Sequence, residues 1–271
     1  HIRDNLDLSP TAYRITLMGV TVGEAEISPD REMAINPGQV FGTVEGTPTR
    51  DPAFGLEAVW IDPASREHAQ SLGFTVVDPN TVVATHLSQI LQSHAHELLG
   101  HEEVQKLLDQ LAKSAPKLVE DLVPKTLTLG TVVKVLQNIL SEGIPIRDMR
   151  TVAETLAENA PQMQDAGNLT AMVRMALGRM IVQKINGLAA ELEVITVSPE
   201  LEQLLLQAVQ GSTEGGAGIE PMLAERLHKG LAESAQMLEM AGKPAVLLTS
   251  PPLRELLARF VKHTISGLHV L

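Results

Sequence analysis

The chain has 271 residues, a formal net charge of −12 and no cysteine. An acidic chain is a poor partner for nucleic acid, whose phosphates select a basic face, and without cysteine it forms neither a disulfide nor a thiolate metal site. It contains no run of about 18 apolar residues, so we expect no membrane-spanning segment within it. Its length allows roughly two to four domains, and its polar start and apolar end suggest a piece of a longer protein.

The first 78 residues are predicted to be rich in β-structure. Alternating apolar side chains predict two strands over 12–18 and 20–27, joined at Gly19. Frequent proline and glycine predict mostly loop over 39–56. The other elements expected in this part are a short apolar run at 33–35, a strand at 56–61, a helix at 63–72 stopped by Gly73, and a strand at 74–77.

The middle of the chain is predicted to be helical. Asp78-Pro79 begins a long helix that Gly100 ends, with apolar residues at spacings of three and four. Residues 161–168 are expected to form a polar loop. The remaining helices are predicted over 101–113, 116–123, 128–140, 146–159 and 169–185.

The last part alternates between strand and helix, which predicts a parallel α/β sheet. The Gly- and Ser-rich residues 211–218 are expected to form a flexible surface loop. Ser250 is expected to cap a helix that runs to His263. The other elements are strands at 192–197, 245–249 and 268–271, and helices at 199–210 and 220–240.

Motifs that carry chemistry are missing from the sequence. There is no Gly-rich phosphate loop, no nucleophile elbow and no spacing that selects a catalytic triad. His94, His96 and His101, with Glu97 nearby, do not converge when placed on a helix broken at Gly100, so we expect no metal site. We therefore expect no cofactor and no enzyme; the alternative of a small-ligand-binding or enzymatic α/β protein would use the strand end at Ser250.

The stretch from Thr49 to Ile61 holds two of the six aromatic residues in the chain, Phe54 and Trp60. Asp51-Pro52 predicts a turn and Gly55 a bend. Large rigid side chains serve both cores and recognition surfaces. Two interpretations therefore stay open: a small core that needs bulky side chains, or a pocket at which Phe54 is presented on the edge of a loop.

Several tracts resemble the cytoplasmic C-terminal region of flagellar type III export-gate proteins, the FHIPEP family. The resemblance covers nearly the whole chain, and it is most specific in the tracts around 51–61 and 76–87. The matching tracts are His1–Leu6, Asp51–Leu56, Val76–Pro79, Thr81–Leu87, Pro116–Val119, Val135–Asn138, Pro145–Asp148 and Val246–Leu248.

The resemblance implies a multidomain α+β fold with four subdomains. The first would comprise 1–29 and 79–98 and would be incomplete at its N-terminus. A small second subdomain would be inserted at 30–78. A helical third would span 99–178, and an α/β fourth would span 179–271 with its last strand truncated.

The same resemblance implies a docking platform for complexes of export chaperones with filament-type substrates, which are passed on to the membrane gate. The family assembles as a nine-membered ring at the cytoplasmic face of the bacterial inner membrane and contacts other export-apparatus components. The flagellar branch is favoured; the alternative is the equivalent component of a virulence type III secretion system. In the family an Asp, a Phe and a Thr mark an apolar chaperone pocket, and the matching residues with their expected lining are Asp51, Phe54, Thr85, Phe41, Leu56, Val77 and Val82. Of these, Asp51 and Thr85 are expected to be exposed.

Overall fold

The computed structural model describes residues 1–211, 220–262, 264–265 and 267–271. It forms two compact units, one made of His1–Arg150 with Gln164–Thr170, the other of Thr151–Met163 with Ala171–Leu271. Most of the loop predicted at 211–218 lies outside the described residues. The division into four subdomains stays a prediction.

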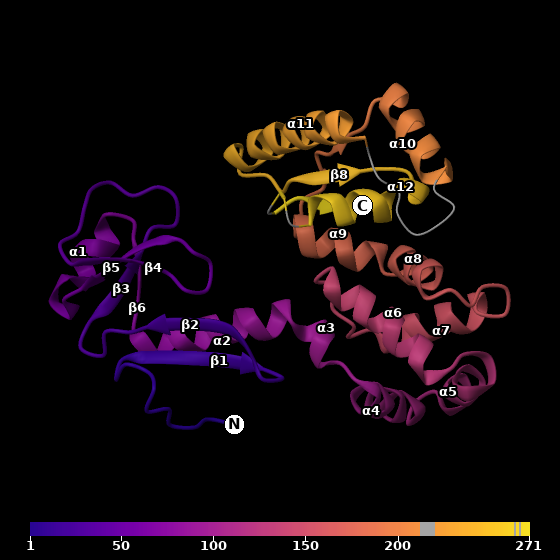
Figure 1. The fold of residues 1–271 in the computed structure, drawn as a ribbon, viewed down its shortest axis with the longest axis horizontal. Helices are drawn as coiled ribbons and strands as arrows, with labels where there is room; N and C mark the ends of the chain where they lie inside the picture. The colour runs from indigo at the N-terminus through magenta and orange to yellow at the C-terminus, as the bar shows by residue number, and fades with distance from the viewer. Residues whose placement is uncertain (212–219, 263, 266) are drawn as a thin grey trace. The chain divides into compact units, whose positions relative to one another are not determined.

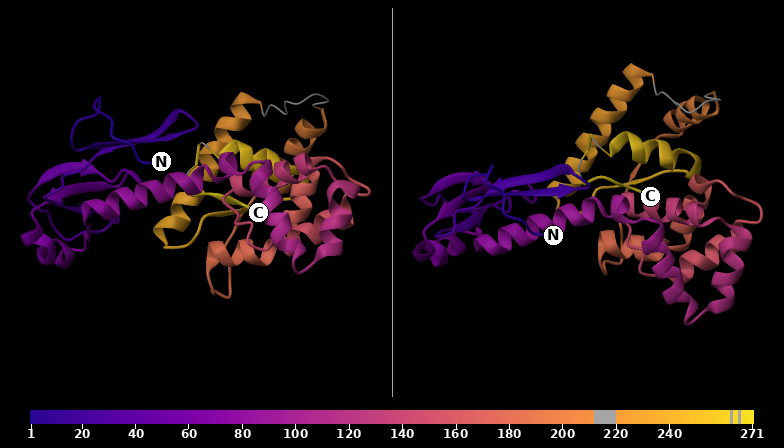
Figure 2. Two further views of the ribbon diagram at one scale, coloured as in Figure 1. Left: turned by 90° about the horizontal axis from the view of Figure 1, so that it is seen from below. Right: turned by 60° about the horizontal axis from the view of Figure 1, so that its bottom comes forward.

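The first unit begins with the predicted hairpin. Strand β1 (Ala12–Leu17) pairs antiparallel with β2 (Val20–Glu26). Met18 and Gly19 both have positive φ, 49° and 86°, as a tight two-residue hairpin turn requires. Helix α2 (Pro79–Ser93) runs alongside this hairpin (Figures 1 and 2). Its N-terminus is capped by Asp78, whose carboxylate accepts from the Thr81 backbone N–H at 2.9 Å.

A four-stranded antiparallel sheet follows, in the order β4-β5-β3-β6. Its strands are β3 (Glu32–Ile35), β4 (Thr47–Arg50), β5 (Glu57–Ile61) and β6 (Thr75–Val77). Strand β4 corrects the prediction of mostly loop over 39–56. Pro48 suggested a loop, but β4 is an edge strand, where proline is tolerated because its missing N–H is not needed for pairing.

The sheet buries both faces. On one face Met33, Ala58 and Trp60 pack with Val82 of α2. On the other, Ala34, Ile61 and Val76 pack with Ala69 of helix α1 (Arg66–Ser71), which follows the short 3-10 helix η1 (Pro63–Ser65). Trp60 is only 4% exposed, so the interpretation as a bulky core residue is confirmed for this aromatic.

The helical segment matches the prediction in its elements but not in every boundary. The long helix expected to reach Gly100 breaks at His94, and the helix expected over 169–185 is two helices separated at Leu177. The helix expected from 146 begins at Met149. The helices are α3 (Ala95–Leu98), α4 (His101–Ala112), α5 (Pro116–Glu120), η2 (Asp121–Thr126), α6 (Leu129–Ser141), α7 (Met149–Asn159), α8 (Ala166–Ala176) and α9 (Gly178–Asn186).

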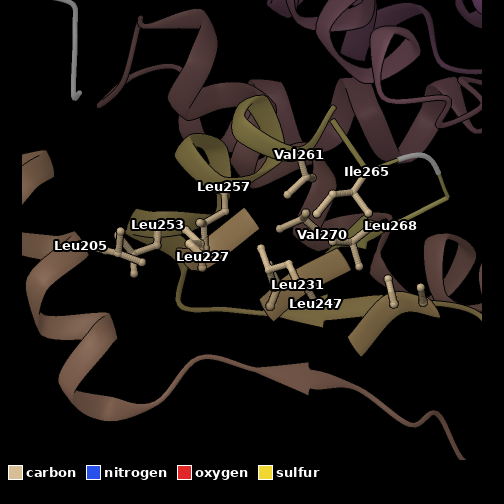
Figure 3. Packing of buried hydrophobic residues seen from close by; sticks show 12 residues of the cluster. Leu205, Leu227, Leu231, Leu247, Leu253, Leu257, Val261, Ile265, Leu268 and Val270 are labelled. Carbon is tan, nitrogen blue, oxygen red and sulfur yellow. The ribbon is translucent and has the colours of Figure 1, made fainter. Parts of the chain in front are cut away.

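The second unit holds the predicted parallel sheet, in the order β7-β8-β9. Its elements are β7 (Ile195–Thr196), α10 (Pro199–Gly211), α11 (Pro221–Met240), β8 (Val246–Leu248), α12 (Pro251–Val261) and β9 (His269–Val270). Apolar side chains of the three helices converge with those of β8 and β9 in one core (Figure 3). Among the described residues, no helix is both long and apolar enough to cross a membrane.

Candidate functional site

The loop Asp51–Leu56 connects the edge strand β4 to β5 and is closed by its own backbone. The Asp51 N–H donates to the Leu56 carbonyl at 2.9 Å, and the Gly55 N–H donates to the Asp51 carbonyl at 2.8 Å. Gly55 has a φ of 70°, a conformation that a side chain disfavours. The Arg50 guanidinium donates to the Gly55 carbonyl at 3.2 Å. The loop is therefore a folded turn with a defined shape.

Phe54 projects from this turn and is 61% exposed. The interpretation as a buried core residue is therefore wrong for Phe54, which lies at the edge of a loop. Phe41 is 81% exposed, and its loop is held by the Phe41 N–H donating to the Leu72 carbonyl at 2.8 Å. The pairings Ile35↔Ala58 and Arg50↔Glu57 put the loops that follow β3 and β4 at the same end of the sheet. Two exposed phenylalanines thus come from loops at the same end of the sheet.

Asp51 is 3% exposed, so the expectation of an exposed rim acceptor is wrong. Its carboxylate accepts from the Phe54 N–H at 2.9 Å and from the Ala53 N–H at 3.3 Å. A carboxylate that binds backbone N–H groups two and three residues ahead organises a turn. Asp51 shapes the loop that carries Phe54 and has little surface to offer a partner.

Two further polar residues lie near Asp51. The Tyr13 hydroxyl and Nδ1 of His86 are joined by a 2.7 Å hydrogen bond between β1 and α2. Burial, with a smaller contribution from the Asp51 charge, raises the pKa of Tyr13 to about 12. Burial lowers the pKa of His86, and the Asp51 charge opposes this. Sequence reasoning missed this pair, since no motif links residues 73 positions apart; the only hint is that Tyr13 is the single tyrosine.

The other expected site residues differ in their exposure to solvent. Leu56 is 39% exposed, whereas Thr85 and Val77 are partly buried. Thr85 precedes His86 on α2 and is partly buried, so the expectation that it is exposed is wrong. Val82 is 2% exposed and belongs to the core with Trp60, so it can form only the floor of a pocket, not its surface lining.

The residues considered for metal binding and for small-ligand binding lie in different surroundings. His94 Nδ1 lies 2.8 Å from Glu97 Oε1, and no group of three metal-binding side chains converges among the residues described by the structure. Ser250 occupies the N-cap position of α12, but its side chain makes no capping hydrogen bond, contrary to expectation. Its hydroxyl and that of Thr249 are buried without a hydrogen-bond partner.

Comparisons with known proteins cover the whole chain. The model of the FHIPEP family matches residues 1–271. The chain is 52% identical over its full length to "Flagellar biosynthesis protein FlhA" of Escherichia coli (strain K12) and spans 39% of that protein. Its fold is similar to the Chlamydia pneumoniae CdsV structure solved as a CdsV and CdsO complex, with a TM-score of 0.84 and 22% identity, covering 100% of this chain and 80% of that one. It is also similar to the nonameric EPEC SctV-C, with a TM-score of 0.76 and 21% identity, covering 96% and 78%.

Proposed function

The chain belongs to the FHIPEP family, and on this premise we propose that it is a cytoplasmic docking platform of a flagellar type III export gate. It binds export chaperones loaded with filament-type substrates and passes the substrates to the membrane gate. The flagellar branch is favoured because identity to the Escherichia coli flagellar relative is 52%, against 22% to CdsV of Chlamydia pneumoniae.

The observation that carries this proposal is the exposure of Phe54 on a folded loop. A rigid aromatic ring at the tip of a hydrogen-bonded turn loses little conformational entropy on binding and buries a large apolar area. Such side chains act as anchors that dominate the affinity of an interface. In a chain with only six aromatic residues, two exposed phenylalanines, Phe54 and Phe41, on loops at the same end of one sheet point to a recognition surface.

The partner side of this contact is proposed to be an amphipathic helix, which presents apolar anchors at helical spacing to a groove. Phe54, Phe41 and Leu56 supply the apolar contact surface. Thr85 supplies a polar group beside it, and Asp51 acts by holding the loop. Val77 lies at the end of β6, and Val82 supports the site from the core.

Assembly and location follow from the same premise. SctV-C of EPEC is described as nonameric, and we propose that the full-length protein forms a similar ring. CdsV of Chlamydia pneumoniae was solved in a complex with CdsO, which supports contacts with other export components. Because the chain spans 39% of the Escherichia coli relative, the remaining length of such a protein would hold the membrane domain. The described part is then the cytoplasmic region of that longer protein, and it has no enzymatic role.

A titration tests the docking function directly. Purified chain is mixed in a calorimeter with flagellar export chaperones from Escherichia coli, each either empty or loaded with its filament-type substrate. We expect saturable binding of loaded complexes. A chain that binds none of the loaded flagellar complexes but binds those of a virulence system would support the alternative branch. Binding to neither would reject the proposal.

A further inference from the structure

Strand β4 has one edge that no other strand in the described residues pairs with, because it lies at the end of the sheet order β4-β5-β3-β6. Its hydrogen bonding to β5 continues into the loop, where the Asp51 N–H donates to the Leu56 carbonyl at 2.9 Å. In an antiparallel pair, a residue bonds to the partner strand only at every second position. Counting back from Asp51, Arg50 and Pro48 therefore turn their backbone groups away from β5, and both residues are exposed.

The opposite side of β5 gives the same alternation. The Asn36 N–H, which follows β3, donates to the Glu57 carbonyl at 2.8 Å, so Glu57 bonds toward β3 and not toward β4. Glu57 is the residue that pairs with Arg50. The outer edge of β4 therefore offers the N–H and C=O of Arg50 and the C=O of Pro48, which has no N–H. One donor and two acceptors can pair with a short added strand, whereas a proline at the edge opposes pairing over a longer stretch.

An open groove of about 700 Å³ borders this edge. It is lined by residues 47–52 and by residues 24–31, which lie at the end of β2 and in the loop after it. Because β4 leads directly into the turn that presents Phe54, a partner docked at Phe54 would hold any chain attached to it near the groove at a high effective concentration. At such an edge an extended segment is recognised by main-chain hydrogen bonds.

The charges in the groove favour a basic occupant. Four carboxylates and two guanidiniums line it. The guanidiniums, those of Arg31 and Arg50, already donate to carbonyl groups of their own chain. Glu26 and Asp30 are exposed and form no ion pair with any described residue. A lysine or arginine of the occupant can therefore pair with Glu26 or Asp30.

We propose that the outer edge of β4 is a second subsite of the docking platform, at which an extended, basic segment of the export substrate adds as a short strand beside Arg50 and Pro48. This inference rests on the proposed docking function and names the part of the loaded complex that the groove takes. The substrate is the source because it is the component passed on to the gate, so a segment of it must leave the chaperone and be held in an accessible form. Recognition through the main chain lets substrates of different sequence share one subsite.

Peptides test this mode of binding directly. Overlapping short peptides that cover one filament-type substrate of Escherichia coli are labelled with a fluorophore and titrated with the whole chain by anisotropy. We expect saturable binding of peptides that carry lysine or arginine. The peptide that binds most tightly is then remade with a single N-methyl group at each successive position.

The N-methyl series distinguishes an added strand from a helix or a flexible segment. In either strand direction, the two peptide N–H groups that meet the carbonyls of Arg50 and Pro48 lie two residues apart. Methylation at either of these positions should raise Kd about tenfold, as loss of one hydrogen bond allows, and methylation at the position between them should leave Kd unchanged.

Charge variants test the groove itself. Asp30→Asn and Glu26→Gln keep the shape of the side chain and should each raise the Kd of a basic peptide by up to about fivefold at low salt. Glu67→Gln is the matched control, since Glu67 is exposed on α1 and does not line the groove, and it should leave Kd unchanged.

The inference is overturned if no peptide binds, if N-methylation has no alternating effect, or if Asp30→Asn and Glu26→Gln both bind as tightly as the wild type. A chain that binds loaded complexes but none of the peptides keeps its docking function and lacks this subsite. A chain that binds peptides with the alternating pattern but no loaded complex has the subsite without the docking function.

Discussion

Replacement of Phe54 by alanine should remove docking while leaving the fold intact. A phenylalanine side chain presents about 200 Å², and Phe54 is 61% exposed, so a partner can bury up to about 120 Å² of it. At about 25 cal/mol per Å² this area contributes about 3 kcal/mol, on the order of a 100-fold rise in Kd for Phe54→Ala. The remaining contact of about 80 Å² inside the folded chain is worth at most about 2 kcal/mol, and about 1.2–1.8 kcal/mol once the compactness of the unfolded chain is considered.

The assay pairs titration with thermal melting. Phe54→Ala is titrated with a loaded flagellar chaperone by calorimetry, and its melting is followed by circular dichroism. Phe260→Ala makes the same chemical change in the second unit, where Phe260 packs against the core of the α/β sheet. That control should lower stability without changing Kd. The anchor role of Phe54 is refuted if Phe54→Ala binds within about twofold of wild type, a change of about 0.4 kcal/mol.

Four further outcomes are expected. Asp51→Ala should lower the free energy of unfolding by about 1–3 kcal/mol in urea titrations, because two loop N–H groups lose their acceptor; unchanged stability would contradict its role in the loop. The pKa of His86 is about 6.5 in the unfolded chain and lower in the folded one, so the unfolded chain binds the proton more tightly. The free energy of unfolding should therefore fall as the pH drops below about 6.5, and His86→Gln should remove that part of the loss. Tyr13 ionises near pH 10 in the unfolded chain but only near pH 12 in the folded one. The free energy of unfolding should therefore fall between about pH 10 and pH 12, and Tyr13→Phe should remove this loss. Gly46→Ala should lower the melting temperature, because the added Cβ would lie 2.3 Å from the Trp60 carbonyl oxygen; an unchanged melting temperature would show that the backbone gives way freely there.

Local patterns predicted most of the elements correctly. The alternation around Gly19 indicated the hairpin, and Asp78-Pro79 located the start of α2. These signals depend on turn geometry and capping, which involve residues close together in the chain. The prediction of loop at Pro48 was wrong because the sequence does not say whether a strand is central or at the edge of a sheet. The break at Leu177 was missed because apolar periodicity continues across it.

At the candidate site, too, local sequence patterns predicted some features, and others depended on the tertiary structure. The amino-acid sequence by itself determined that a turn carries Phe54 at 51–56, and it identified the family whose pocket this tract resembles. Only the tertiary structure decided that Phe54 is exposed, that Asp51 is buried and that Val82 belongs to the core. Burial depends on which distant elements pack against a residue. Tyr13 and His86 are 73 positions apart, and only folding joins them by a hydrogen bond between β1 and α2, which is why no local pattern could indicate the pair.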